Sequence, residues 1–423
     1  MEKVQLRRFV YAIGLLFVLT LFQGGSSAAE SGSQEIQQAE SIRHSTAHEV
    51  QQLLDQKVAE YGIPGAVMAV MKGGRKAQIF VSGVASLSDN RPITGKDRFR
   101  VGSNTKTFAA MTILQLAQEG KLSLDAKLGD ALVNWPQGIG IKKKMSNFDV
   151  SNITIRQMLQ HTSGIFSFTE DDNWVNNFLT NTYYRYEPDM LVSIANSHAP
   201  YCSPGGCFHY SNTNYVLLGL IIQEVTGQKL ETEIRKRFIE PLGLSNTLVP
   251  LMGLPSIPGS SSNGHDIMDG YWFDYTMMDP SSTWCSGNMV STAADLAKWI
   301  MALGRGDLLN RAYNDQQRQW VKMPGYTSLY YGLGVIHDDA YGLIGHQGGI
   351  VGYSTQMYYL ESEDTALVFL YNITFPNTVK DFSVVMTYDV LPILFPHRRW
   401  PSKATVAAEG VERKWRPGLL NEY

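Results

Sequence analysis

The sequence is poor in cysteine and in charge for its length. It has three cysteines among 423 residues, and charged residues make up 18% of the chain, with a formal net charge of −3. It contains neither a C-x-x-C pair nor an H-E-x-x-H motif, so we expect no metal ion and no other cofactor. The mildly acidic balance argues against a nucleic-acid partner. A hydrophobic content of 44% fits a globular chain with a sizeable core.

The chain also lacks a hydrophobic run long enough to be a confident membrane span. Its main apolar run, residues 9–22, follows three basic residues and precedes the small-residue tripeptide Ser27-Ala28-Ala29. This order is typical of a signal peptide with its cleavage site. We therefore expect residues 1–29 to be removed and the mature protein to be periplasmic or extracellular, without a stable membrane span. An uncleaved anchor is the alternative, which the good cleavage site disfavours.

Two of the cysteines stand close together in the sequence. Cys202 and Cys207 flank Ser-Pro-Gly-Gly, a turn sequence that can bring them together. A disulfide is plausible in an oxidising compartment and would brace the loop that enters Tyr210. Two small buried thiols are the equally weighted alternative. The remaining Cys285 is expected to be a buried small residue.

The stretch Ser103-Asn104-Thr105-Lys106 is the most informative part of the chain, because a helical pattern follows it. A hydroxyl and an amine three residues apart lie about one helical turn apart on one face. A lysine whose pKa is lowered can act as the base that activates a serine. The helix N-terminus adds N–H groups where an oxyanion would form. Alone, the pattern could equally be an N-cap serine beside a solvated lysine.

Two later motifs favour the catalytic interpretation. They are Tyr210-Ser211-Asn212 and His346-Gln347-Gly348. The order S-x-x-K, Y-x-N, [K/H]-x-G resembles the serine β-lactamase and penicillin-binding protein superfamily. The tyrosine and histidine types place it closest to the branch of class C β-lactamases, D-Ala-D-Ala carboxypeptidases and D-aminopeptidases. Supporting segments also match, among them His161-Thr162-Ser163-Gly164 and Tyr331-Gly332-Leu333-Gly334, and the resemblance runs from about Val50 to about Phe395.

The resemblance implies catalytic roles for three residues. Ser103 would be the nucleophile, and Lys106 and Tyr210 would be the base candidates. The sequence does not divide the base role between these two, because they are expected to titrate as a coupled set. A tyrosine needs nearby cations to become a useful base, and Lys106 and His346 are the expected sources. The ordinary alternative for Tyr210 is a core tyrosine.

The resemblance also implies substrate-binding roles. Asn212 would hydrogen-bond Lys106 and the substrate amide. His346 stands where β-lactamases carry lysine and could donate to the substrate or to Tyr210. The remaining implied positions are Gln347, Gly348 and Gly349, with the Gly349 N–H as the second oxyanion donor beside that of Ser103. His161, His209 and His265 are interpreted as structural.

The order of expected elements indicates an α+β fold. Strands are expected over residues 66–71, 78–85, 331–337, 341–345, 353–360 and 366–372, with helices over 292–303 and 378–391. We expect an antiparallel sheet flanked by helices, built from residues 30–124 and 280–396. An all-helical domain, residues 125–279, would be inserted into it, and residues 397–423 would form a C-terminal tail. The active site would lie between the two domains.

One departure from the family pattern affects the expected substrate. Penicillin-processing relatives carry hydroxyl residues that bind the substrate carboxylate where this chain has Gln347 and Gly349. The leading interpretation is therefore a secreted serine hydrolase that cleaves peptide or amide bonds of D-amino-acid-containing substrates through an acyl-enzyme on Ser103. An esterase is the alternative, with a D-Ala-D-Ala carboxypeptidase, a β-lactamase or a non-catalytic binding protein behind it. The expected partner is a small-molecule or peptide substrate; the sequence does not indicate an oligomeric state.

Overall fold

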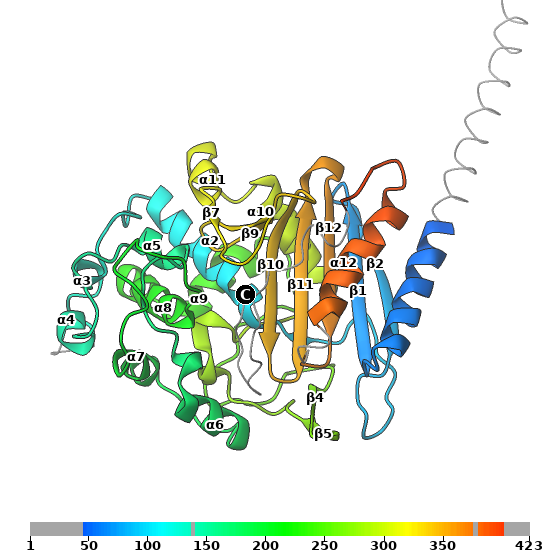
Figure 1. Ribbon diagram of the computed structural model, residues 1–423, viewed down its shortest axis with the longest axis horizontal. Coiled ribbons are helices and arrows are strands. Elements are labelled where there is room, and N and C mark those ends of the chain that lie inside the picture. Colours follow the sequence, from blue (N-terminus) through cyan, green and yellow to red (C-terminus); the bar gives the residue numbers. More distant parts are fainter. Residues whose placement is uncertain (1–44, 137–139, 375–379, 402–423) are drawn as a thin grey trace, which may run out of the picture.

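A computed structural model describes residues 45–136, 140–374 and 380–401. The expected signal peptide, residues 1–29, lies outside the described residues, as does most of the expected tail. An eight-stranded antiparallel sheet forms the centre of the fold (Figure 1), in the order β2-β1-β12-β11-β10-β9-β8-β7. Its strands are β1 Gly65–Lys72, β2 Gln78–Gly83, β7 Val321–Lys322, β8 Leu329–Tyr331, β9 Ile336–Asp338, β10 Leu343–Ile350, β11 Tyr353–Leu360 and β12 Thr365–Tyr371.

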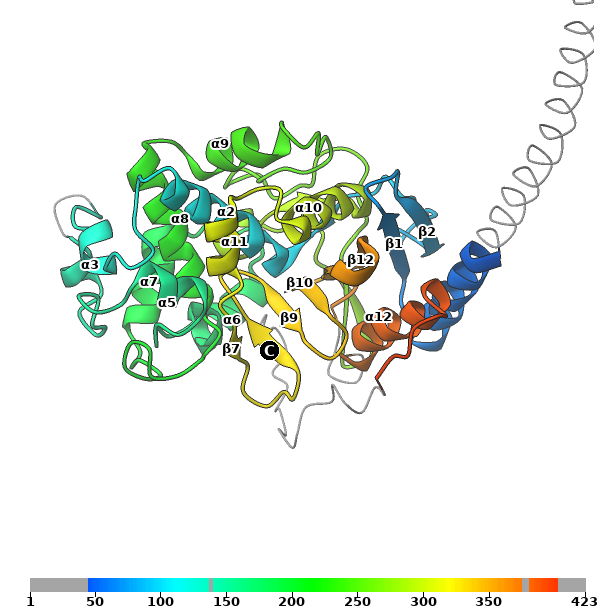
Figure 2. The same cartoon turned by 90° about the horizontal axis from the view of Figure 1, so that it is seen from above.

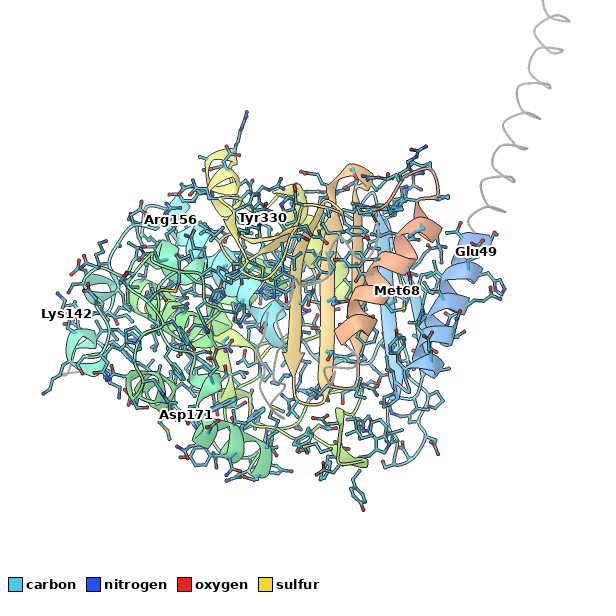
Figure 3. All side chains as sticks on the ribbon, in the orientation of Figure 1. Glu49, Met68, Lys142, Arg156, Asp171 and Tyr330 are labelled. Carbon is cyan, nitrogen blue, oxygen red and sulfur yellow. A yellow bond between two sulfur atoms is a disulfide. The ribbon has the colours of Figure 1, made fainter. Side chains whose placement is uncertain are left out.

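Helices cover each face of the sheet. Side chains along each strand point alternately to the two faces, so each face has its own hydrophobic core. On β1, Val67 and Ala69 belong to the larger core, whereas Met68 and Val70 belong to a second core on the opposite face. Figure 3 labels Met68 on that second face. There, residues 45–60, which are helical, and α12 Lys380–Leu394 cover the sheet. Seen from above, α10 Ala293–Arg305 lies on the other side (Figure 2).

The helices beside the sheet come from the middle of the chain (Figure 1). Their buried centre is α8, Asn212–Thr226, in which every residue from Asn212 to Ile222 is buried. It packs against α2, Thr105–Gln118. The others are α3 Leu128–Ala131, α4 Ile141–Lys144, α5 Ile155–Leu159, α6 Asp172–Thr180, α7 Pro188–Asn196, α9 Leu230–Ile234 and, later in the chain, α11 Arg311–Gln317. A hairpin of β4, His265–Met268, and β5, Tyr271–Asp274, was not expected in this stretch.

The large antiparallel sheet with its many helices confirms the expected fold class. Two details differ from expectation. Residues 331–337 form no single strand: β8 and β9 are separated by a turn in which Gly334 has φ +82°, a conformation that favours glycine. The strand expected over 341–345 extends as β10 to Ile350. No helix in the described part of the chain combines the length and apolarity needed to cross a membrane.

A short pairing brings distant segments to the centre of the molecule. β3, Phe99–Arg100, pairs with β6, Val290–Ser291. β3 leads into a 3₁₀ turn, Gly102–Asn104, which opens α2. The same turn packs against β10 and β11. Ser103 therefore stands where the sheet, α2 and the segment before β6 meet.

Candidate active site

The turn that carries Ser103 is fixed against the sheet. Asn104 donates from Nδ2 to Thr355 Oγ1 on β11 at 2.7 Å. Gly102 has φ +50°, and a Cβ there would come within 2.8 Å of the Gly349 backbone nitrogen. Only glycine permits this approach without displacement. The Ser103 backbone is therefore held next to the backbone of Gly349, with the serine side chain 4% exposed.

Lys106 lies beneath the serine and is completely buried. Its Nζ is 2.9 Å from Ser103 Oγ. It also lies 2.7 Å from Asn212 Oδ1 and 2.7 Å from the Ser286 carbonyl oxygen. Burial lowers the pKa of Lys106 well below its ordinary value, because the charged form loses its hydration.

These three contacts accommodate both charge states of Lys106. The oxygens of Asn212 and Ser286 are acceptors only, so they take two amine hydrogens in either state. In the neutral amine, the remaining lone pair faces Ser103 Oγ and can accept its proton. In the ammonium ion, the third N–H donates to the same oxygen. The site can therefore receive a proton from Ser103 without a change in its hydrogen-bond partners.

Tyr210 lies just before α8 and is 5% exposed. Lys106 Nζ lies 4.9 Å from the centre of its ring. The ring of His161 lies 4.1 Å from it, centre to centre, and that of His346 lies 6.4 Å away. The first two motifs thus come together in the structure.

His346 takes a different position from the one expected. It lies on β10 and is fully buried, with Nε2 2.9 Å from the Tyr331 hydroxyl and Nδ1 beside the Gln347 carbonyl oxygen. Burial and the nearby Lys106 lower its pKa to about 3. We expected His346 to supply a cation to Tyr210 or to donate to the substrate. The structure supports neither role, because both ring nitrogens face internal partners and burial favours the neutral ring.

The three residues after His346 have different surroundings. Gln347 donates from Nε2 to the hydroxyl of Tyr358, on the face of the sheet that carries α12, so its side chain is not in the site. Gln347 therefore stays a predicted substrate-binding position only through its backbone. A Cβ on Gly348 would lie 2.0 Å from the Val101 carbonyl oxygen, whereas a Cβ on Gly349 would meet nothing within 4 Å.

The second half of β10 has one open edge. β9 pairs with β10 only from Leu343 to Gly345, and no described strand pairs with the same edge from His346 onward. A two-residue turn joins Ile350 to Tyr353, so these two residues form a hydrogen-bonded pair. Hydrogen-bonded and non-hydrogen-bonded pairs alternate along antiparallel strands, so Gly349 and Ser354 form a non-hydrogen-bonded pair. The N–H of Gly349 is thereby directed to the open edge, beside the Ser103 turn. Two N–H groups can converge there on one oxygen.

Asn212 joins the two sides of the site. Its Oδ1 accepts from Lys106, while its Nδ2 donates to Thr169 Oγ1 at 3.0 Å.

Cys202 and Cys207 form a disulfide in the structure, with their Cα atoms 6.1 Å apart. Cys285 is buried, and burial raises the pKa of its thiol to about 12.

Several contributors were missed from the sequence. Ser286 acts through its backbone carbonyl, which no side-chain pattern reveals. Thr169 and Thr355 are common residues without a motif. Tyr331 and His161 do lie in segments that matched the family, so the signal was present, although it gave no role.

A family model described as Beta-lactamase matches residues 50–383. The chain belongs to the beta-lactamase family. A solved D-stereospecific amidohydrolase from a Streptomyces species is 33% identical, with a TM-score of 0.71, over 80% of this chain and 97% of that one. The D-amino acid amidase of Ochrobactrum anthropi SV3, in complex with D-phenylalanine, is 25% identical, with a TM-score of 0.69, over 84% of this chain and 100% of that one.

Two curated proteins are also similar to this chain. Protein flp of Staphylococcus aureus is 30% identical over 49% of this chain, and the match covers 39% of flp. Penicillin-binding protein 4* of Bacillus subtilis is 24% identical over 73% of this chain and 68% of that protein. The chain thus spans well under half the length of the curated relative at the higher identity.

Proposed function

We propose that the protein is a serine hydrolase that cleaves amide bonds in D-amino-acid-containing substrates. The observation that carries the proposal is the fully buried Lys106 amine, 2.9 Å from Ser103 Oγ and held by two carbonyl oxygens. The names of the two similar structures, an amidohydrolase and an amidase of D-amino acids, support the substrate class.

The proposed reaction has two halves. Ser103 Oγ attacks the amide carbon while its proton passes to the pair formed by Lys106 and Tyr210, and the oxyanion binds the N–H groups of Ser103 and Gly349. The proton then moves to the departing nitrogen, the C–N bond breaks, and an ester remains on Ser103. Water attacks this ester and gives a proton to the base pair, which passes it to Ser103 Oγ as the C–O bond breaks and the acid is released.

Strand β10, which carries His346, Gln347 and Gly348, supports a preference for substrates without a free carboxylate. The side chains of His346 and Gln347 make internal contacts, and Gly349 has no side chain. A substrate carboxylate therefore gains no charge-assisted hydrogen bond from these three side chains, each such bond contributing roughly 1.5–3 kcal/mol. We expect C-terminal amides of D-amino acids and D-peptides to be hydrolysed at least as well as the matched free-acid peptides.

Three measurements test the proposal. Ser103→Ala should lower kcat on the order of a million-fold, the loss seen when a hydrolase nucleophile is removed. Mass spectrometry after a slow acylating inhibitor should place the adduct on the peptide that contains Ser103. A panel of D- and L-amino acid amides with matched esters then fixes the class. Hydrolysis of esters alone would make the protein an esterase, and an active Ser103→Ala enzyme would refute the serine mechanism.

A further inference from the structure

We infer that His161 is a positioning residue for Tyr210, a role that goes beyond the proposed function and rests on it. His161 opens the segment His161-Thr162-Ser163-Gly164, which is far from Tyr210 in the sequence. It is completely buried and adopts φ +59°, a left-handed conformation that is uncommon for histidine. Such strain persists only where the surroundings over-determine it, and it is concentrated at functional sites.

His161 bonds to the residues on both sides of Tyr210. Its backbone carbonyl accepts from the N–H of His209 at 2.9 Å. Its ring Nδ1 lies 3.1 Å from the N–H of Ser211, which therefore donates to it. The residues immediately before and after Tyr210 are thus both tied to His161 through their backbone N–H groups.

The same imidazole also packs against the phenol ring. Its centre lies 4.1 Å from that of Tyr210, at an interplanar angle of 33°. The rings of Tyr331 and Tyr215 approach it at 4.8 Å and 5.3 Å. His161 thereby holds Tyr210 through a hydrogen bond to each neighbouring residue and through contact between the two rings. This fixes its ring above Lys106 Nζ, the reacting centre of the proposed mechanism.

These contacts require a neutral histidine that is not itself the base. Nδ1 must accept from Ser211, so the ring hydrogen is on Nε2. Burial, followed by the positive charge of Lys106, lowers the pKa of His161 well below its ordinary value, in agreement with the neutral form. Nε2 is buried and has no hydrogen-bond partner among the described residues. Within the part of the chain that the structure describes, no hydrogen bond or ring contact joins His161 to Ser103, so we infer that it acts through Tyr210.

The test uses two substitutions of equal size. His161→Asn keeps an oxygen near the position of Nδ1 and tolerates positive φ, whereas His161→Leu has the same shape and no acceptor. Both lose the ring. We expect His161→Leu to lower kcat by about 10- to 100-fold with KM changed less than about threefold, as for a small misplacement of a catalytic group. His161→Asn should retain at least about ten times the kcat of His161→Leu.

A double-mutant cycle with Tyr210→Phe separates positioning from general destabilisation. If His161 acts through Tyr210, His161→Leu should lower kcat less than about twofold when Tyr210 is already phenylalanine. Equal losses in both backgrounds, or equal kcat for the Asn and Leu variants, would overturn the inference while leaving the proposed function intact. Full activity of Tyr210→Phe alone would instead refute the part of Tyr210 in the proposed mechanism. Should His161→Leu not fold, His161→Phe, which keeps a ring without an acceptor, replaces it in the cycle.

Discussion

At the scale of the residue, burial decides what each side chain can do. Lys106 and His346 are both basic, and both lie completely out of water. Lys106 has two carbonyl acceptors, so it can hold a proton when Ser103 gives one up. His346 has one hydroxyl and one carbonyl partner, which a neutral ring satisfies. The two residues therefore do not share a role, although both belong to the motifs.

The buried His346 predicts a loss of stability in acid. Its pKa is about 3 in the folded protein and about 6.5 in an unfolded chain. Between these values the unfolded chain binds a proton that the folded chain does not, so stability falls as the pH falls from about 6.5 toward 3. His346 contributes about 2 kcal/mol to the fall in the free energy of unfolding between pH 7 and pH 5.

Urea unfolding at both pH values tests this expectation in wild type and His346→Gln. The variant should lose about 2 kcal/mol less than the wild type over the same interval. His48→Gln is the control, because His48 is exposed and its replacement should leave the interval unchanged. Equal pH dependence in wild type and His346→Gln would show that folding does not lower the pKa of His346.

Gly349 predicts how carboxylate recognition could be gained. A Cβ at this position meets nothing within 4 Å, so threonine fits and places a hydroxyl beside the open edge of β10. One added charge-assisted hydrogen bond should raise kcat/KM for free-acid D-peptides by about tenfold. Gln347→Thr is the comparison. Residues 347 and 349 project from the same face of β10, but the Gly349 backbone lies against the Ser103 turn, whereas Gln347 lies beside Tyr358, so Gln347→Thr should give no gain. A gain from Gln347→Thr alone would contradict this difference in position.

At the scale of the element, the site depends on β10 lying close to the Ser103 turn. A Cβ on Gly348 would come within 2.0 Å of the Val101 backbone oxygen. Gly348→Ala must therefore separate the strand from the turn, and a shift of about 1 Å at an active site can lower the rate about 100-fold. Gly349→Ala, one residue further along, adds the same methyl group in open space. The loss of kcat should be far larger for Gly348→Ala, and the reverse order would contradict this packing.

The loop closed by Cys202 and Cys207 is a second element that supports the site. It leads into His209 and Tyr210, and the Gly205 N–H donates to the Thr162 carbonyl at 2.8 Å. Closing so short a loop stabilises the fold by about 2 kcal/mol in the chain-entropy model. Cys202→Ser with Cys207→Ser should lower the free energy of unfolding by about that amount and reduce kcat.

The matched control for the disulfide is Cys285→Ser, since Cys285 is the free and buried cysteine. A reducing agent should lower the free energy of unfolding of Cys285→Ser as much as that of the wild type. It should leave the free energy of unfolding of the double variant unchanged. A wild-type protein whose unfolding is unaffected by the reducing agent would show that the disulfide contributes nothing.

At the scale of the whole molecule, the site lies where the sheet meets the helical part. Ser103 comes from the 3₁₀ turn that opens α2, Lys106 from α2, Asn212 from α8, and Gly349 from β10. We propose that this molecule works outside the cytoplasm, after removal of the expected signal peptide. N-terminal sequencing of exported protein should then find a start at or near Glu30. Retention of residues 9–22 in a membrane fraction would instead favour an anchor.

The sequence by itself determined the features that depend on local spacing. A separation of three residues puts Ser103 and Lys106 on adjacent positions of one helical turn, whatever the rest of the chain does. Apolar runs bounded by turn residues likewise predicted β1, β11 and β12, because side chains on a strand alternate with a period of two. The order of the three motifs predicted the family, which the family model confirmed.

Only the tertiary structure decided the charge and direction of the groups in the site. The partners of Lys106 are 106 and 180 positions away in the sequence, and one of them is a backbone carbonyl. The neutral state of His346 follows from complete burial beside Tyr331, and the direction of Gln347 follows from the register of β10 on β11. The role inferred for His161 depends on the same kind of contact. Desolvation and register arise from packing between distant segments, so local sequence patterns do not contain them.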